Sequence, residues 1–307
     1  MSRATHTLIA SALIVLLAGV SACSLNPGVN ALPSSDPSHP DLTWRPHVRT
    51  DPALAAQLPD DVRATGVLRV ATSSSLPPMT YVAGDNVTLV GFDVDMATVV
   101  ADVLGLRANI STAGFDTLIP GLQSGRFAMV MSSMGVTAER QKVVDFVDYY
   151  YGGEGFLASR STDFRVERLE DLCGRRVAVQ TGSTQQSTLE DSRRICPDAG
   201  LPPYDLQAFP GTNAAVLAIR GNRVDVLYAS ISIVGYTAAQ NDDFRVAGRY
   251  RRAMVGAALA KDSPLTPLVR QAIQRLIDDG TYGRLLDKWG LMDSAVKTAR
   301  INSAGAS

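Results

Sequence analysis

The arginine in the stretch VMSSMGVTAERQKVVDF, residues 130–146, stands where its chemistry would suit anion capture. An apolar strand leads through Ser133 and Gly135 to Thr137, a natural helix N-cap, and Arg140 lies one turn later. A guanidinium is a planar fork that can donate two hydrogen bonds to one carboxylate. The spacing therefore predicts a carboxylate-binding side chain at the start of a short helix.

A second segment, QTGSTQ at residues 180–185, has the features of an anion-binding helix N-terminus. Gly182, Ser183 and Thr184 follow an expected strand and open an expected helix. Backbone N–H groups point outward at the start of a helix and hydroxyls add donors, so this segment could hold an anion. A third segment, GFDTLIP, places Phe115 in a strand-to-helix loop, where its ring could line a pocket.

Each of these features has a purely structural alternative. Arg140 could form an ion pair with Asp145 or Asp148. The two hydroxyls after Gly182 could do no more than cap their helix, and Phe115 could do no more than pack. Taken singly, the three segments leave both interpretations open.

Strands alternate with helices along the chain, which predicts an α/β protein with a largely parallel sheet. Strands are expected at residues 66–73, 108–112, 128–132, 176–180, 224–230, 244–250 and 255–260, and helices at 96–104, 117–125, 213–221 and 265–277. Such sheets bind ligands beyond the carboxyl ends of their strands, where the three segments above are placed. Each of the three segments is therefore a candidate for ligand binding.

Composition is that of a globular protein large enough for two domains. The chain has 307 residues, of which 46% are apolar and 19% charged. Its 29 basic and 30 acidic side chains nearly cancel, so no basic field would attract nucleic acid. Nucleic-acid partners are excluded on this ground.

The N-terminus has the pattern of an export signal followed by a tether. Its apolar run is short for a membrane span of about 20 residues and is typical of a signal peptide, expected over residues 1–22. The tetrad VSAC resembles a bacterial lipobox, which predicts that Cys23 is lipidated; cleavage elsewhere would leave it unmodified. Residues 23–50 are rich in proline and serine and predict a flexible tether that joins the protein to a membrane.

The remaining cysteines, Cys173 and Cys196, form an even pair in a chain expected to be exported, where disulfides persist. Pairing would close a loop worth about 3 kcal/mol in the chain-entropy model. Two buried thiols are the alternative. A metal site is disfavoured because no histidine is near, and no cofactor is expected.

Six ordered motifs together resemble bacterial extracellular solute-binding proteins of family 3, the polar amino-acid receptors of ABC importers. They are LRVATSSSLPPMTY, LVGFDVDMATVVADVLG, FDTLIPGLQSGRFAMVMSSMGVTAERQKVVDFVDYYY, LCGRRVAVQTGSTQ, IRGNRVDVLYAS and LIDDGTYGRLLDKWG. The resemblance implies a two-lobed α/β fold of the periplasmic-binding-protein type II, with a ligand cleft between the lobes. Residues 51–156 with 255–291 would form lobe 1, residues 157–254 lobe 2, and residues 292–307 a C-terminal tail. It also implies an extracytoplasmic monomer that delivers its ligand to an ABC permease.

Carried over position by position, the resemblance assigns roles to several residues. Arg140 would pair with the α-carboxylate of the ligand, and Ser183 and Thr184 would donate to the same group from the other lobe. Ser133 would contribute a backbone contact and Phe115 a pocket wall. The two strands that cross between lobes would lie near residues 155–158 and 254–256.

Five positions depart from the family pattern. The family usually places an aromatic residue at Leu76, a phenylalanine at Met79 and an acid at Ser73. Gly135 replaces a threonine, and Ser230 replaces the aspartate that pairs with the ligand α-ammonium. A neutral hydroxyl cannot match a carboxylate there, since charge-assisted hydrogen bonds are roughly twice as strong. The carboxylate end of the site is therefore expected to be intact, while the amine end is left open.

An enzyme on the same scaffold, similar to cyclohexadienyl dehydratase, is the alternative function. It would need a general acid or base in the cleft. All three histidines, His6, His39 and His47, lie in the signal or the tether, so the commonest proton-transfer residue is missing from the lobes. The sequence favours a binding protein without catalytic activity.

Overall fold

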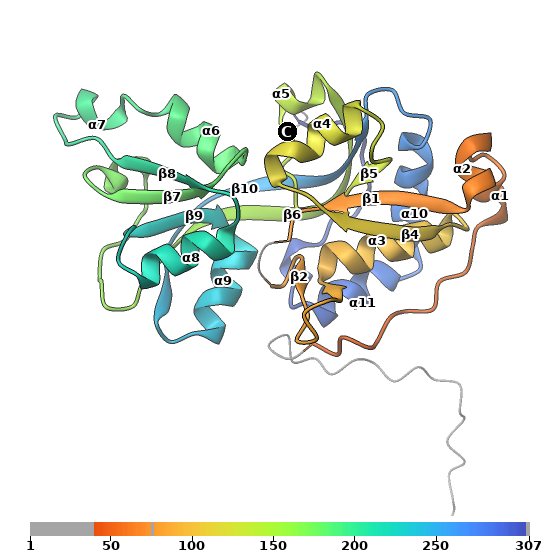
Figure 1. Cartoon of the computed structure of the whole chain (residues 1–307), viewed down its shortest axis with the longest axis horizontal. Helices are drawn as coiled ribbons and strands as arrows, with labels where there is room; N and C mark the ends of the chain where they lie inside the picture. Colours follow the sequence, from red (N-terminus) through yellow and green to blue (C-terminus); the bar gives the residue numbers. More distant parts are fainter. Residues whose placement is uncertain (1–39, 75–76, 305–307) are drawn as a thin grey trace, which may run out of the picture. The chain divides into compact units, whose positions relative to one another are not determined.

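Two long antiparallel strands, β6 (Val144–Ser159) and β10 (Phe244–Ala260), run side by side through the middle of the sheet (Figure 1). The computed structural model describes residues 40–74 and 77–304, which belong to one compact unit. Its main sheet has eight strands in the order β4-β1-β5-β10-β6-β9-β7-β8. Each of the remaining strands of this sheet therefore lies on one side or the other of the central pair.

Lobe 1 is built on the β10 side of that pair. Three mutually parallel strands, β1 (Val67–Thr72), β4 (Arg107–Thr112) and β5 (Met129–Val130), complete its part of the sheet. The helices α3 (Phe92–Val103), α10 (Thr266–Asp278) and α11 (Thr281–Lys288) supply one core on one face. The helix α4 (Leu118–Gln123) supplies a second core with β5 and the first half of β6. The strands of lobe 1 thus contribute side chains to two hydrophobic cores.

Lobe 2 lies on the β6 side and contains β7 (Arg176–Gln180), β8 (Asp205–Phe209) and β9 (Val226–Ser230). The helices α6 (Thr184–Asp191) and α7 (Ile195–Asp198) belong to one of its cores, and α8 (Thr212–Arg220) and α9 (Ile231–Gln240) to the other. A disulfide joins Cys173 to Cys196, which confirms the predicted pair. This mixed α/β, two-lobed architecture is the fold class that the motif order predicts.

Short elements connect the lobes' main strands and helices. They are α1 (Pro52–Ala55), α2 (Asp60–Thr65), β2 (Tyr81–Val82), β3 (Leu89–Val90), η1 (Phe115–Thr117), α5 (Ala138–Gln141), η2 (Leu169–Leu172) and η3 (Met292–Ser294). The strands β2 and β3 form a separate hairpin. Of these elements, η1 and α5 carry two of the side chains singled out from the sequence.

Both ends of the described chain pack on lobe 1. Trp44 lies against its core, and the buried ammonium of Lys288 donates to the Trp44 carbonyl at 2.8 Å. Trp44, which lies within the residues expected to form the tether (23–50), thus packs on lobe 1. At the other end, Ile301 forms a bridge to Val147 on β6, and Ser303 donates to Asp148 at 2.9 Å. The expected C-terminal tail is thus attached to the sheet of lobe 1.

The predicted signal peptide, Cys23 and Leu76 fall outside the described residues. Over the part of the chain that is described, no helix has the length and apolar character needed to cross a bilayer.

Candidate functional site

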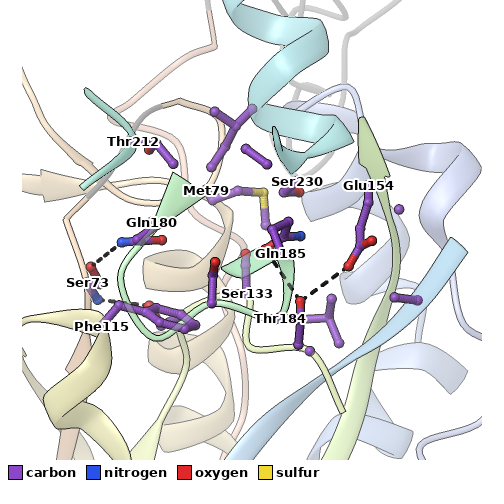
Figure 2. Close-up of a pocket in the computed structure, with 18 of the residues that line it drawn as sticks. Ser73, Met79, Phe115, Ser133, Glu154, Gln180, Thr184, Gln185, Thr212 and Ser230 are labelled. Carbon is purple, nitrogen blue, oxygen red and sulfur yellow. Dashed lines mark hydrogen bonds between the residues drawn. The ribbon is translucent and has the colours of Figure 1, made fainter. Parts of the chain in front are cut away.

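One pocket gathers the side chains that the sequence singled out, and residues of both lobes line it. Nine of the ten expected ligand-binding residues are among its lining: Ser73, Met79, Phe115, Ser133, Gly135, Arg140, Ser183, Thr184 and Ser230. The tenth, Leu76, is not described. Figure 2 shows several of them converging from separate strands and loops. The lining also includes Asp93 and Glu154, two acids that the sequence analysis did not select.

Arg140 is held in the pocket by backbone oxygens. It lies on α5, whose N-cap Thr137 accepts a hydrogen bond from the Arg140 N–H at 3.2 Å, as predicted. Its guanidinium donates to the carbonyls of Gly135 and Gly182, each at 2.9 Å, and stands 5.7 Å from the centre of the Phe115 ring. The bond to Gly182 crosses from lobe 1 to lobe 2. Burial lowers the pKa of Arg140 to about 10, so the side chain remains a cation at neutral pH.

Arg140 does not form the ion pair with Asp145 or Asp148 that was its structural alternative. Asp145 pairs instead with Lys261 at 2.9 Å, and Asp148 accepts from Ser303. Among the residues that the structure describes, no carboxylate lies within ion-pair distance of Arg140. A partly buried cation without a counterion is electrostatically incomplete, and an anionic ligand would complete it.

Gly135 lies against both Arg140 and the second lobe. It forms an antiparallel bridge with Val255, flanked by hydrogen bonds from the residues on either side, so its own N–H and carbonyl face away from β10. A Cβ atom added here would stand 3.3 Å from the Thr184 methyl carbon. A side chain at position 135 would therefore pack tightly against Thr184.

The N-terminus of α6 faces Arg140 from the other lobe. Ser183 is buried and is the N-cap, with its hydroxyl accepting from the Gln186 N–H at 3.2 Å. Its hydroxyl therefore serves the helix as well as lining the pocket. The Thr184 hydroxyl lies 3.3 Å from Glu154 Oε1 and 3.4 Å from Gln185 Oε1 (Figure 2). Since a hydroxyl has one proton, Thr184 can donate to only one of these oxygens at a time.

Ser133 is fixed by a buried acid. Its backbone is left-handed, with φ of +47°, its N–H donates to the Tyr149 hydroxyl at 3.1 Å, and its own hydroxyl donates to Asp93 at 2.9 Å. The Ser133 N–H thus already has a hydrogen-bond acceptor in the protein, although Ser133 was expected to make a backbone contact with the ligand. Burial raises the pKa of Asp93 to about 7, against the lowering effect of its hydrogen bonds to Tyr149 and Ser133.

Asp93 and Glu154 carried weak signals in the sequence. Asp93 stands second in α3, in a first turn where acids are ordinary because they favour the helix dipole. Glu154 is the only charge in the stretch YYYGGEGFLAS, and a lone acid in a buried strand calls for a partner. The structure supplies it: Arg251 on β10 donates from Nε to Glu154 Oε2 at 2.7 Å.

The rim of the pocket brings the lobes together at further points. Ser73 follows β1, and its N–H donates to Ser132, which follows the adjacent strand β5. The Ser73 hydroxyl in turn meets the Gln180 amide of lobe 2 at 3.4 Å (Figure 2). Met79 is buried, and its loop approaches Gly91 so closely that an added Cβ would stand 2.0 Å from the Met79 carbonyl oxygen. Only glycine fits that position.

The described residues contain no cluster of three or more histidine, cysteine, aspartate or glutamate side chains placed to hold a metal ion. What the pocket offers is one unpaired cation, a helix N-terminus, several hydroxyls and two buried acids. Such a set can bind a small molecule that has both an anionic and a cationic group.

Comparison with known families decides the class of protein. Residues 68–292 match the family described as bacterial extracellular solute-binding proteins, family 3. The chain belongs to this family. The match spans both lobes and every described pocket residue, and it confirms the resemblance seen in the motifs.

Among curated relatives, the arginine-binding extracellular protein ArtP of Bacillus subtilis is 33% identical over 227 residues, covering 72% of this chain and 85% of the relative. The arginine-binding protein ArgT of Corynebacterium glutamicum is 26% identical over 254 residues, covering 82% and 83%. An L-cystine-binding protein of Escherichia coli is 26% identical over 232 residues, covering 74% and 84%. The relatives thus bind amino acids of different side-chain chemistry.

Solved structures agree on the fold. An ancestral arginine-binding protein bound to arginine superposes with a TM-score of 0.66 and 31% identity, covering 73% of this chain and 98% of that one. An ancestral amino acid-binding protein described as a precursor of cyclohexadienyl dehydratase gives a TM-score of 0.67 and 29% identity, covering 75% and 98%.

Proposed function

We propose that the protein is an extracytoplasmic receptor that captures a small carboxylate-bearing solute, with a polar amino acid as the first candidate, and delivers it to an ABC importer. The observation that carries this proposal is Arg140. Its guanidinium lies in a pocket shared by two lobes and contacts backbone carbonyls but no described carboxylate. A ligand carboxylate would supply the missing anion, and the N-terminus of α6 would add donors from the facing lobe.

The ligand would be held by hinged closure of the lobes. A ligand shifts an open–closed equilibrium only through contacts that it makes better in one state, and donors from both lobes provide such contacts. Arg140 from lobe 1 and Thr184 from lobe 2 line the same pocket. The hinge would lie in β6 and β10, where β6 carries Gly152, Gly153 and Gly155. The proposed boundary between lobes accordingly falls within these two strands, near residues 156 and 254.

A carboxylate requirement can be tested without knowing the ligand. The purified chain would be screened by thermal shift against the L-amino acids and against their carboxamides, such as L-arginine beside L-argininamide. A ligand that binds only the native state raises the melting temperature. We expect shifts with the acids and none with the matching amides. Equal shifts for an acid and its amide would contradict the role given to Arg140.

Lipidation of Cys23 would place the receptor at the outer face of the cell membrane, anchored by its acyl chains. The supporting observation is the VSAC tetrad after a short apolar run. Cys23→Ser is expected to move the protein from the membrane fraction to the soluble fraction, with loss of the lipid mass in mass spectrometry. Unchanged fractionation of the variant would contradict this anchor.

An enzyme on the same scaffold is the second candidate, and one observation favours it. Asp93, which lines the pocket, has its pKa raised by burial to about 7, where a side chain can exchange protons near neutrality. Against it, both Asp93 oxygens hold structural hydrogen bonds, to Ser133 and Tyr149. Incubation with prephenate or arogenate separates the two functions, because a binding protein forms no aromatic product.

A further inference from the structure

Ser230 is uncharged, but an acidic residue lies across the strand pair from it. The strands β6 and β9 are antiparallel, and their register places Glu154 directly opposite Ser230. Side chains at opposed positions lie on the same face of a sheet, with Cβ atoms about 4.5–5.5 Å apart. Both residues line the pocket (Figure 2). A carboxylate from position 154 therefore enters the space that a side chain at position 230 also borders.

The two oxygens of Glu154 are used unequally. Oε2 accepts from Arg251 Nε at 2.7 Å and also from the Tyr228 hydroxyl. Oε1 has only two long contacts, each of 3.3 Å, to Arg251 Nη2 and to the Thr184 hydroxyl. A carboxylate oxygen commonly accepts two good hydrogen bonds, at about 2.7–2.9 Å from charged donors. Oε1 therefore has capacity for a stronger donor, on the side where Thr184 lines the pocket.

Arg251 holds Glu154 in place from the solvent side. The pairing of β10 with β6 shifts by one residue between Arg249 and Arg252, a bulge that contains Arg251. The Arg251 side chain is 46% exposed, whereas that of Glu154 is 3% exposed. Arg251 also donates to Thr188 at 2.7 Å, one turn after Thr184 on α6. Water thus screens the guanidinium, while the carboxylate is buried where it lines the pocket.

The Thr184 hydroxyl links this acid to the carboxylate site. Its single proton can be donated either to Glu154 Oε1 at 3.3 Å or to Gln185 Oε1 at 3.4 Å. If that proton turns to a ligand carboxylate held by Arg140, Oε1 loses one of its two contacts. In an α-amino acid the ammonium is bonded to the carbon that carries the carboxylate, so it would arrive beside Thr184 at that moment. The ammonium then replaces the lost donor with a charged one.

We infer that Glu154 Oε1 accepts the α-ammonium of the ligand and takes the role of the aspartate that Ser230 replaces. This inference rests on the proposed carboxylate receptor and names its ligand class more closely as α-amino acids. Glu154 is then a specificity-determining residue, because an acid without the α-amino group would bind to Arg140 and leave Oε1 without its donor.

The test uses matched probes that differ only in the α-amino group: L-arginine with δ-guanidinovaleric acid, L-glutamine with glutaramic acid, and L-glutamate with glutaric acid. Calorimetric titration of the full chain is expected to show at least one amino acid binding about 10- to 100-fold tighter than its partner acid. Glu154→Gln should remove most of that ratio by weakening amino-acid binding, and should leave the partner acid nearly unaffected.

The double variant Glu154→Gln with Ser230→Asp separates an ammonium acceptor from a purely structural ion pair. Moving the carboxylate across the strand pair should restore the preference for amino acids, whereas a structural role of the Glu154–Arg251 pair would not be rescued. Should Glu154→Gln fail to fold, Glu154→Gln with Arg251→Gln removes both charges together and is expected to fold, because it leaves neither member of the half-buried pair without its partner.

The outcomes distinguish the two proposals. A wild-type chain that binds the desamino acids as tightly as the amino acids overturns the role of Glu154 and leaves the carboxylate receptor standing. Loss of binding to both series in Glu154→Gln, with no recovery in the double variant, also overturns it. A wild type that binds neither series contradicts the carboxylate receptor itself.

Discussion

Replacement of Arg140 tests the centre of the site, and its effect can be worked out from the structure. Arg140→Ala removes the pocket's only cation that is free of a described carboxylate partner. Truncating one member of a desolvated, hydrogen-bonded charge pair costs about 2–5 kcal/mol, or roughly 30- to 5,000-fold in Kd. We expect ligand binding in this variant to weaken by at least the lower figure.

Two matched variants make the measurement specific. Arg140→Lys keeps the charge but loses the fork that now reaches Gly135 and Gly182, so its affinity should lie between those of wild type and Arg140→Ala. Arg126→Ala removes an exposed arginine that stacks on Phe127, away from the pocket, and should leave Kd unchanged. Isothermal titration calorimetry with the acid found in the thermal-shift screen gives all three values.

The ligand-free stability of Arg140→Ala offers an independent readout. Burial lowers the Arg140 pKa to about 10, which means that the protein environment disfavours its charge. Removing that charge relieves this cost but also removes the hydrogen bonds to Gly135 and Gly182, so the unliganded melting temperature should stay close to that of wild type. A variant that melts well below wild type yet binds ligand with unchanged Kd would refute the reasoning, since Arg140 would then be a structural residue.

Three further predictions concern the disulfide, a buried acid and a glycine. Replacing Cys173 and Cys196 by serine should lower the free energy of unfolding in urea by about 3 kcal/mol, as expected for the loop they close over a sequence separation of 23; an unchanged midpoint would contradict this. Asp93 has a folded-state pKa raised to about 7, so the native state binds more protons than the unfolded state between about pH 4 and 7, and stability should fall as pH rises through that window. The free energy of unfolding should be measured at several pH values for wild type and for Asp93→Asn. As pH rises from about 4 to 7, wild type should lose up to a few kcal/mol relative to Asp93→Asn, and a parallel pH dependence of the two proteins would contradict this. Gly135→Thr, which restores the family residue, should weaken ligand binding by about 10-fold because its Cβ would crowd the Thr184 methyl; tighter binding would show that the lobes can accommodate it.

Most of the fold followed from periodicity and turn chemistry. The strand predicted at residues 176–180 is β7 with the same bounds, and the helix predicted at residues 96–104 is followed by Gly105, whose φ is +70°. By contrast, two separate strands were expected at 244–250 and 255–260, whereas β10 is continuous over residues 244–260. The gap between them begins with Arg251 and Arg252, which are charged and exposed, so no alternation marks it as strand. Its strand character comes from pairing with β6, which no local pattern encodes.

The candidate site likewise contains residues that could be identified from sequence and one that could not. Residues that act through local chemistry, such as the N-cap Thr137 and the arginine one turn later, could be found from sequence. Glu154 could not, because its meaning depends on the register that sets it opposite Ser230 and on the bulge that brings Arg251 to it. A strand register is fixed by pairing over the whole sheet, and a one-residue slip would turn Glu154 to the other face.

The two departures from the family that looked like losses are each matched by a contact in the facing structure. Gly135 has no hydroxyl of its own, but it lies beside Thr184, a hydroxyl residue from the other lobe. Ser230 has no charge of its own, but it lies directly opposite Glu154, which has a carboxylate. An added Cβ at Gly135 would stand 3.3 Å from the Thr184 methyl carbon, a tight contact, and a carboxylate at position 230 would face Glu154 with like charge. Each departure is therefore physically consistent with its neighbour, because the facing wall of the pocket already holds a hydroxyl and an acid at these points.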